Sequence, residues 1–187
     1  MSELILKIER IMRAFVPEAT PYIDVEKKNS IWEDFSLKNN GSFKIVRSRD
    51  HTFSRLRMEI PLAKYTVKFE ESDTHLLRIK CDIGCKDFMF YISFEDLFEK
   101  IIKTFNNNEI EIGDKEFDDK YLITTNDERK MMKILSDRKL KDLLIKNDVS
   151  NFHLDNGELF ILGNRQLDSI EELNDILKIF KNVISKI

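Results

Sequence analysis

The spacing of apolar residues along the chain changes several times, and each spacing predicts a different kind of element. At the start, apolar side chains recur every three or four positions from Leu4 to Phe15. Ser2 precedes this pattern as a helix cap, and Pro17 follows it. The first segment is therefore predicted to be a helix that packs one face against the rest of the protein.

Between about Tyr22 and Phe94 the pattern changes to a period of two, which is typical of strands. Turn-forming breaks such as Asn-Asn-Gly separate the strand-like segments. These segments are SFKIVRSR, FSRLRMEI, KYTVKFE, HLLRIKCDI and DFMFYISF. Since consecutive strands joined by short turns pair antiparallel, the pattern predicts a meander of about five strands.

Helical spacing returns after Ser93, where apolar residues line one face as far as Phe105. A strand, KYLITT, comes later, and Thr125 with Glu128 then matches a capping box at the head of a longer helical region. The segment SDRK interrupts the apolar stripe of this region before Leu144. It is therefore predicted to form two helices or one bent helix.

The last part of the chain contains the signals of a hairpin and a helix. In NFHLDNGELFIL, Asn156-Gly157 suits the positive φ angles of a type I′ turn between two strands. Asp168 with Glu171 matches another capping box, and an apolar stripe follows it as far as Ile187. The chain is predicted to end in an amphipathic helix.

Together these elements predict an α+β protein. Its antiparallel sheet contains the meander of about five strands and the later hairpin, and N-terminal, central and C-terminal helices pack on that sheet. The length of 187 residues favours one domain over residues 1–187. A soft seam is expected near residues 106–113, between a β-rich N-terminal part and an αβ C-terminal part.

The composition indicates where the protein works and which partners are unfavourable, but it does not indicate a specific function. Lys and Arg number 31 and Asp and Glu 34, a formal net charge of −3, which disfavours nucleic acid as a partner. Charged residues interrupt every apolar segment before it reaches the ~18 residues that cross a bilayer, and no secretory signal is recognised at the start. Cys81 and Cys85 are too few for a disulfide framework. We expect a cytoplasmic bacterial protein that does not enter a membrane.

The stretch FKIVRSRDHTFSRLR concentrates positive charge, with four of the ten arginines of the chain within eleven residues. Its basic residues are Lys44, Arg47, Arg49, Arg55 and Arg57. Residues two apart share a strand face, so a hairpin turn near Asp50-His51 could bring the arginine pairs together. Such a cluster suits an acidic protein surface or a small anion. The alternative is that these side chains only solvate one face of a sheet.

The stretch IGDKEFDDKY concentrates negative charge. Residues 109 to 120 include six acidic residues and two lysines, a local net charge of −4. An EF-hand starting at Asp114 fails, because its sixth and twelfth positions would be Asp119 and Thr125. Asp118-Asp119-Lys120 matches the D-x-K element of metal-dependent nucleases, which needs a further carboxylate on a neighbouring strand. The alternative, purely structural interpretation is a turn at Gly113-Asp114 that leads into a strand.

Other catalytic signatures are weak or absent in the sequence. Cys81 and Cys85, with His75 upstream, lack the second ligand pair of a structural zinc site. No Walker loop, dinucleotide fingerprint, G-x-S-x-G or H-E-x-x-H motif occurs. We therefore predict no metal, no cofactor and no catalytic residue, and the pattern favours a protein that is not an enzyme.

The acidic stretch also resembles a segment of a family of uncharacterised bacterial proteins. The residues that carry the resemblance are Gly113, Asp114, Phe117, Asp118, Tyr121, Ile123, Asp127 and Leu135. In that family a G-D-x-x-F-D-x-x-F/Y segment precedes a strand and a leucine-rich helix, and the likeness covers about the last 80 residues. It implies a structural module with Phe117 and Tyr121 in the core and Asp118 as a turn or cap residue, and it carries no function.

These observations predict a non-catalytic binding or interaction protein of the adaptor, inhibitor or immunity type. Its predicted binding residues are the basic ones, Lys44, Arg47, Arg49, Arg55 and Arg57. The predicted partner is an acidic protein or a small anion, and a homodimer joined through the opposed charges is a further alternative. The alternative from another class is a metal-dependent nuclease or hydrolase that uses Asp114, Asp118, Asp119 and Lys120.

Overall fold

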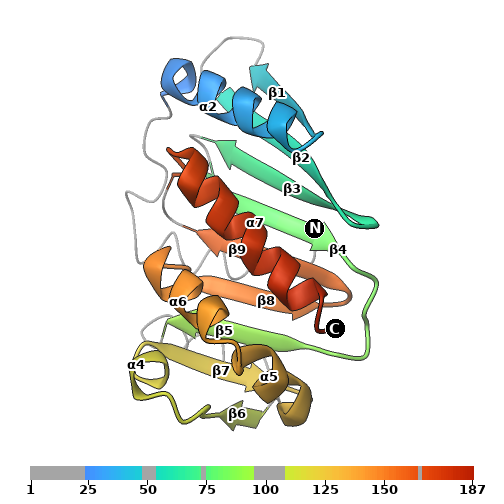
Figure 1. Cartoon of the computed structure of the whole chain (residues 1–187), viewed down its shortest axis with the longest axis vertical. Helices are drawn as coiled ribbons and strands as arrows, with labels where there is room; N and C mark the ends of the chain where they lie inside the picture. Colours follow the sequence, from blue (N-terminus) through green and yellow to red (C-terminus); the bar gives the residue numbers. More distant parts are fainter. Residues whose placement is uncertain (1–23, 48–53, 73–74, 95–107, 164–165) are drawn as a thin grey trace.

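The computed structural model describes residues 24–47, 54–72, 75–94, 108–163 and 166–187, and its centre is one antiparallel sheet (Figure 1). The sheet contains nine strands within the described residues, in the order β1-β2-β3-β4-β9-β8-β5-β7-β6. The strands are β1 (Ser42–Arg47), β2 (Ser54–Leu62), β3 (Tyr65–Ser72), β4 (His75–Asp82), β5 (Phe90–Phe94), β6 (Asn108–Ile110), β7 (Tyr121–Thr125), β8 (Asn151–Asp155) and β9 (Glu158–Gly163). The helices are α2 (Val25–Lys38), α4 (Lys115–Asp118), α5 (Glu128–Leu135), α6 (Arg138–Lys146) and α7 (Ile170–Ile184).

The predicted α+β class and the antiparallel sheet are confirmed, but the sheet is larger than expected. Strands β1 to β4 form a meander in chain order, whereas β5 does not lie next to β4. The β8–β9 hairpin separates them, so β4 pairs with β9 and β5 pairs with β8 and β7. Four of the five residues of β5 are buried, as expected for a strand in the middle of a sheet. The alternating pattern predicts the strands, but it does not contain the order in which they pair.

Several local predictions are confirmed. Asn156 and Gly157 have φ angles of 49° and 83°, as a type I′ turn between β8 and β9 requires. The helical region after β7 consists of two helices, α5 and α6. The helices predicted before residue 24 and across residues 95–105 lie outside the described residues.

The prediction of extended structure from Tyr22 onwards is wrong for residues 25–38, which form α2. The Asp24 carboxylate caps this helix by accepting a hydrogen bond from the Lys27 amide at 3.0 Å. Ile31, Trp32 and Phe35 have the spacing of one helix face, and Trp32 and Phe35 are buried. The apolar residues of this helix face are few and are separated by polar residues, so a search for alternating apolar positions does not detect the helix.

The capping boxes are also displaced from their predicted positions. The cap of α5 is Asp127 instead of Thr125, and its carboxylate accepts from the Lys130 amide at 3.0 Å. The box before α7 is shifted by one residue: the Ser169 hydroxyl accepts from the Glu172 amide at 3.2 Å. The Glu172 carboxylate in turn accepts from the Asp168 amide at 2.9 Å.

Helices α2, α5, α6 and α7 lie on the same face of the sheet, in front of it in Figure 1. The main core lies between these helices and the strand residues that point toward them. Trp32 of α2, for example, packs against Phe43 of β1 and Phe69 of β3, with ring centroids 6.1 and 6.3 Å apart. Among the described helices, none is both long enough and apolar enough to cross a membrane.

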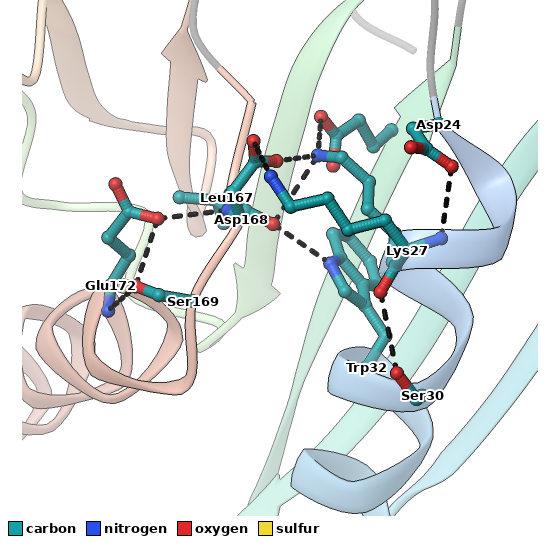
Figure 2. A network of polar contacts seen from close by, with 10 residues as sticks. Asp24, Lys27, Ser30, Trp32, Leu167, Asp168, Ser169 and Glu172 are labelled. Atoms are coloured by element: carbon teal, nitrogen blue, oxygen red, sulfur yellow. Dashed lines mark hydrogen bonds and ion pairs between the residues drawn. The ribbon is translucent and has the colours of Figure 1, made fainter.

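A buried polar network joins α2, β3 and the start of α7 (Figure 2). The Lys28 ammonium, 1% exposed, lies 2.7 Å from a carboxylate oxygen of Glu71 and 2.7 Å from one of Asp168. The Leu167 carbonyl accepts from Lys28 at 3.3 Å and from the Trp32 indole at 3.1 Å. Lys28 and Trp32 of α2 are thus both bonded to the segment that leads into α7.

Candidate anion-binding groove

A hollow of about 420 Å³ lies over β1 to β4 and reaches Phe160 of β9. We call it the basic groove. Its charged residues are Lys44, Arg55, Arg57, Glu59, Lys68, Glu70, Arg78 and Lys80. Six of these side chains are cationic and two are carboxylates, which gives a net charge of +4. The hollow lies within the range of volumes that is usual for small-molecule sites.

Strand alternation places these charged side chains on the face opposite the helices. In β2, Met58 and Ile60 are buried in the core under the helices, whereas Arg57 and Glu59 point the other way. The same alternation holds in β3, where Phe69 points to the core. Each strand of the meander therefore contributes charged side chains to the same open face.

The first row across the groove consists of residues that pair directly between strands. Lys44 of β1 pairs with Arg57 of β2, Arg57 pairs with Glu70 of β3, and Glu70 pairs with Arg78 of β4. The Arg57 Nε donates to the Glu70 carboxylate at 2.6 Å. The other two nitrogens lie farther from that carboxylate, Arg78 Nη1 at 3.7 Å and Arg55 Nε at 4.0 Å. Three guanidinium groups thus converge on one carboxylate.

The second row lies two residues along the strands and is rich in lysine. Glu59 pairs with Lys68, Lys68 pairs with Lys80, and Lys80 pairs with Phe160 of β9. Lys68 Nζ is 4.0 Å from the Glu59 carboxylate, and Lys80 Nζ is 3.0 Å from that of Glu158. Two lysines directly opposite each other on one face repel, and the Glu59 and Glu158 carboxylates on either side offset this repulsion only in part.

Beyond Phe160 the same face of the sheet carries buried rings. The His153 ring stacks between Tyr91 and Phe160, with a centroid distance of 5.2 Å to each. Burial lowers the pKa of His153 to about 3 and raises that of Tyr91. At neutral pH the stack is therefore uncharged.

The structure places three of the five predicted binding residues in the groove, namely Lys44, Arg55 and Arg57. Arg49 lies outside the described residues. Arg47 pairs with Ser54, and alternation along β1 puts it on the opposite face from Lys44. The turn predicted near Asp50-His51 lies outside the described residues. The register between β1 and β2 separates Arg47 from Arg55, because facing residues have one odd and one even number.

Inspection of the sequence missed the part of the groove that β3 and β4 supply. These residues are Lys68, Glu70, Arg78 and Lys80. A signal for them exists, since each strand carries two charged residues at alternate positions between buried apolar ones. It lacks the local density of arginine that marks residues 47–57, and it matters only once the strands are neighbours.

The acidic segment lies at the other end of the sheet, around α4, β6 and β7 (Figure 1). The Asp114 carboxylate accepts a short hydrogen bond from Lys141, and Asp118 accepts from the Ile112 amide at 3.0 Å. Lys120 Nζ lies 2.8 Å from the Asp148 carboxylate. Phe117, in α4 instead of the predicted strand, is buried. These contacts describe a turn that is held by Asp118 from within and tied to α6 and the residues after it.

Metal-site geometry gives the hydrolase alternative no support. Within the described part of the chain, no three His, Cys, Asp or Glu side chains gather where they could hold a metal ion. Cys81 and Cys85 are both free thiols. Burial raises the pKa of the Cys81 thiol to about 11, which keeps it protonated and unreactive.

Comparisons with known proteins bear on the fold alone. No protein-family model matches the chain, and no curated protein matches it with significance. Among solved structures, the crystal structure of the mycobacterial trehalose monomycolate transport factor A, TtfA, is similar with a TM-score of 0.58. The match has 6% sequence identity and covers 88% of this chain and 95% of that chain. The likeness at this identity is one of chain topology.

Proposed function

We propose that this protein is a non-catalytic binding protein that holds a phosphate or carboxylate group of its ligand in the basic groove. The observation that carries the proposal is the convergence of Arg55, Arg57 and Arg78 on the single carboxylate of Glu70. Guanidinium groups in this arrangement are the usual partners of phosphate and carboxylate. The four side chains together carry a formal net charge of +2, which favours an anionic ligand.

The exposure of these groups supports binding from solution. The side chains of Arg55 and Arg57 are 30% and 39% exposed, and those of Lys68 and Lys80 are 54% and 42% exposed. They are accessible to a ligand, while their stems are packed along the strands. Partial burial of this kind reduces the screening of charge by water and strengthens an ion pair with the ligand.

The chemistry of the groove favours binding over proton transfer. Arginine remains protonated at every physiological pH and cannot act as a base. It donates several hydrogen bonds in a fixed plane, which orients an anion without reacting with it. The groove therefore suits recognition of a charged group.

Anion-dependent thermal stability tests the proposal. Sodium phosphate should raise the melting temperature of the wild-type protein above that in sodium chloride of the same ionic strength, because a ligand stabilises the state that binds it. The double variant Arg55→Gln/Arg57→Gln should lose this increment. The matched control Lys133→Gln/Lys181→Gln removes two exposed charges from α5 and α7 and should retain it. The proposed function would be rejected if phosphate stabilised both variants equally. It would also be rejected if neither phosphate nor citrate stabilised the wild-type protein.

A further inference from the structure

The basic groove contains two separate groups of cations, and their separation restricts the ligand. The arginine cluster surrounds Glu70, and the lysine pair Lys68 and Lys80 lies one row away. Residues two apart on a strand are separated by about 7 Å. The two groups are thus close enough for one small molecule to contact both.

The lysine pair carries the argument. Lys68 and Lys80 are direct partners across β3 and β4, a placement that costs stability because like charges face each other. Lys80 has a carboxylate partner at 3.0 Å in Glu158, whereas Lys68 has Glu59 only at 4.0 Å. An anion between the two ammonium groups would relieve the repulsion. The Glu70 carboxylate does not supply that anion, because it accepts a 2.6 Å hydrogen bond from Arg57 in the other row.

We propose that the ligand of the basic groove is a small molecule with two anionic groups about 7 Å apart, such as a sugar bisphosphate. One group binds the guanidinium cluster of Arg55 and Arg57, and the other binds between Lys68 and Lys80. The inference rests on the proposed function and adds the number and spacing of the anionic groups. The hollow of about 420 Å³ and its net charge of +4 match a compact polyanion better than a flat protein surface.

Calorimetric titration of the wild-type protein with fructose bisphosphate and with fructose monophosphate tests the spacing. The bisphosphate should bind at least about tenfold more tightly, because only it contacts both groups. In Lys68→Gln/Lys80→Gln this ratio should fall to near one, and affinity for the monophosphate should fall only as far as the lower net charge of the groove requires. In Arg55→Gln/Arg57→Gln the affinity for both ligands should fall. The control Lys133→Gln/Lys181→Gln should behave like the wild type.

The outcomes separate this inference from the proposed function. If both phosphates bind the wild type equally well, the two-group ligand is rejected and the anion-binding function stands. If neither binds but a peptide of alternating Glu and Asp does, the ligand is an acidic protein segment and the inference is again rejected. If none of the three binds, both proposals fall. The decisive ratio is measured on the wild type, so it does not depend on the folding of a variant.

A phosphorylated lipid headgroup could present the same two-anion chemistry. Co-sedimentation with vesicles that contain phosphatidylinositol bisphosphate distinguishes this source from a free ligand. The volume of the hollow favours a free molecule, so we expect soluble bisphosphate to bind and vesicles not to sediment the protein. Binding to vesicles without binding to the soluble bisphosphate would contradict the inference.

Discussion

Glu70 and Glu71 are neighbours in β3 and have opposite surroundings. Glu70 points to the open face, where it is 21% exposed and meets arginines. Glu71 points to the helix side, where it is 2% exposed and meets Lys28 of α2. The pairing between β3 and β4 is irregular at this point, between Glu70 and Ser72. One strand thus connects an accessible charge cluster with a buried one.

The comparison shows how burial divides the roles of identical side chains. Breaking a buried pair leaves an uncompensated charge in a medium that solvates it poorly, so the network of Lys28 holds α2 against the segment before α7. Exposed pairs contribute little to stability, because water solvates both partners and salt screens them. The pairs around Glu70 are part-exposed, so rearranging them around a ligand should cost less stability than disturbing the network of Lys28. The following predictions test this division, from the largest effect to the smallest.

Replacing Lys28 with Met should cause the largest loss of stability. The substitution removes the cation that contacts Glu71, and it removes one of the two lysines that contact Asp168. Breaking a buried pair of this kind lowers the free energy of unfolding by about 3–5 kcal/mol. The free energy of unfolding in urea at about pH 8 measures the loss. Lys27→Met is the matched control, because Lys27 contacts the same Asp168 at 3.3 Å but is 55% exposed. Equal losses for both variants would refute the division by burial.

Glu71 should make stability depend on pH, and the Glu71→Gln variant should lack this dependence because its amide does not titrate. Burial raises the pKa of Glu71 from 4.5 to about 7, against the opposing effect of Lys28. The folded state therefore binds the proton more tightly than the unfolded state, and its contribution is fully present below pH 4.5 and is lost as pH rises through about 7. The gap corresponds to about 3 kcal/mol.

Urea unfolding of wild type and Glu71→Gln across this pH range measures the effect. The difference in unfolding free energy, wild type minus variant, should rise by about 3 kcal/mol between pH 8 and pH 4.5, because other titrating groups cancel in the difference. A difference that stays flat, or that falls toward acid, would show that Glu71 is ionised without penalty in the folded protein.

Glu70→Gln should have a much smaller effect on stability and a clear effect on binding. The variant removes an ion pair that is part-exposed, so we expect a loss of at most about 1 kcal/mol, smaller in high salt. It also raises the net charge of the groove by one unit, so phosphate should bind several-fold more tightly. Urea unfolding and phosphate titration measure the two effects. A loss as large as that of Lys28→Met would mean that the open-face cluster is structural.

Lys68→Gln should produce the smallest change in stability, and this change should be a gain instead of a loss. The substitution removes the repulsion with Lys80 across the strand pair, at the expense of a weak 4.0 Å contact with Glu59. We expect a gain of about 0.2–0.5 kcal/mol in low salt, measured by urea unfolding. A loss of stability would show that Lys68 is held by interactions within the protein instead of being available to an anion.

The sequence predicted features that depend on residues close together along the chain better than features that depend on residues far apart. The hairpin turn at Asn156-Gly157 was predictable, because two adjacent residues determine its φ angles. Helix α2 was missed, because its apolar residues are few and only packing against β1 and β2 reveals their common face. The insertion of β8 and β9 between β4 and β5 was not predictable, because strand order depends on contacts between residues about 80 positions apart.

The candidate site divides in the same way. The sequence by itself determined that Arg55 and Arg57 share a strand face, since alternation is a local property of an extended chain. Only the tertiary structure decided that Arg78 and Lys80 join them and that Arg47 does not. It also decided which of Glu70 and Glu71 is buried. Register causes this difference, because a shift of one residue moves every side chain of a strand to the other face.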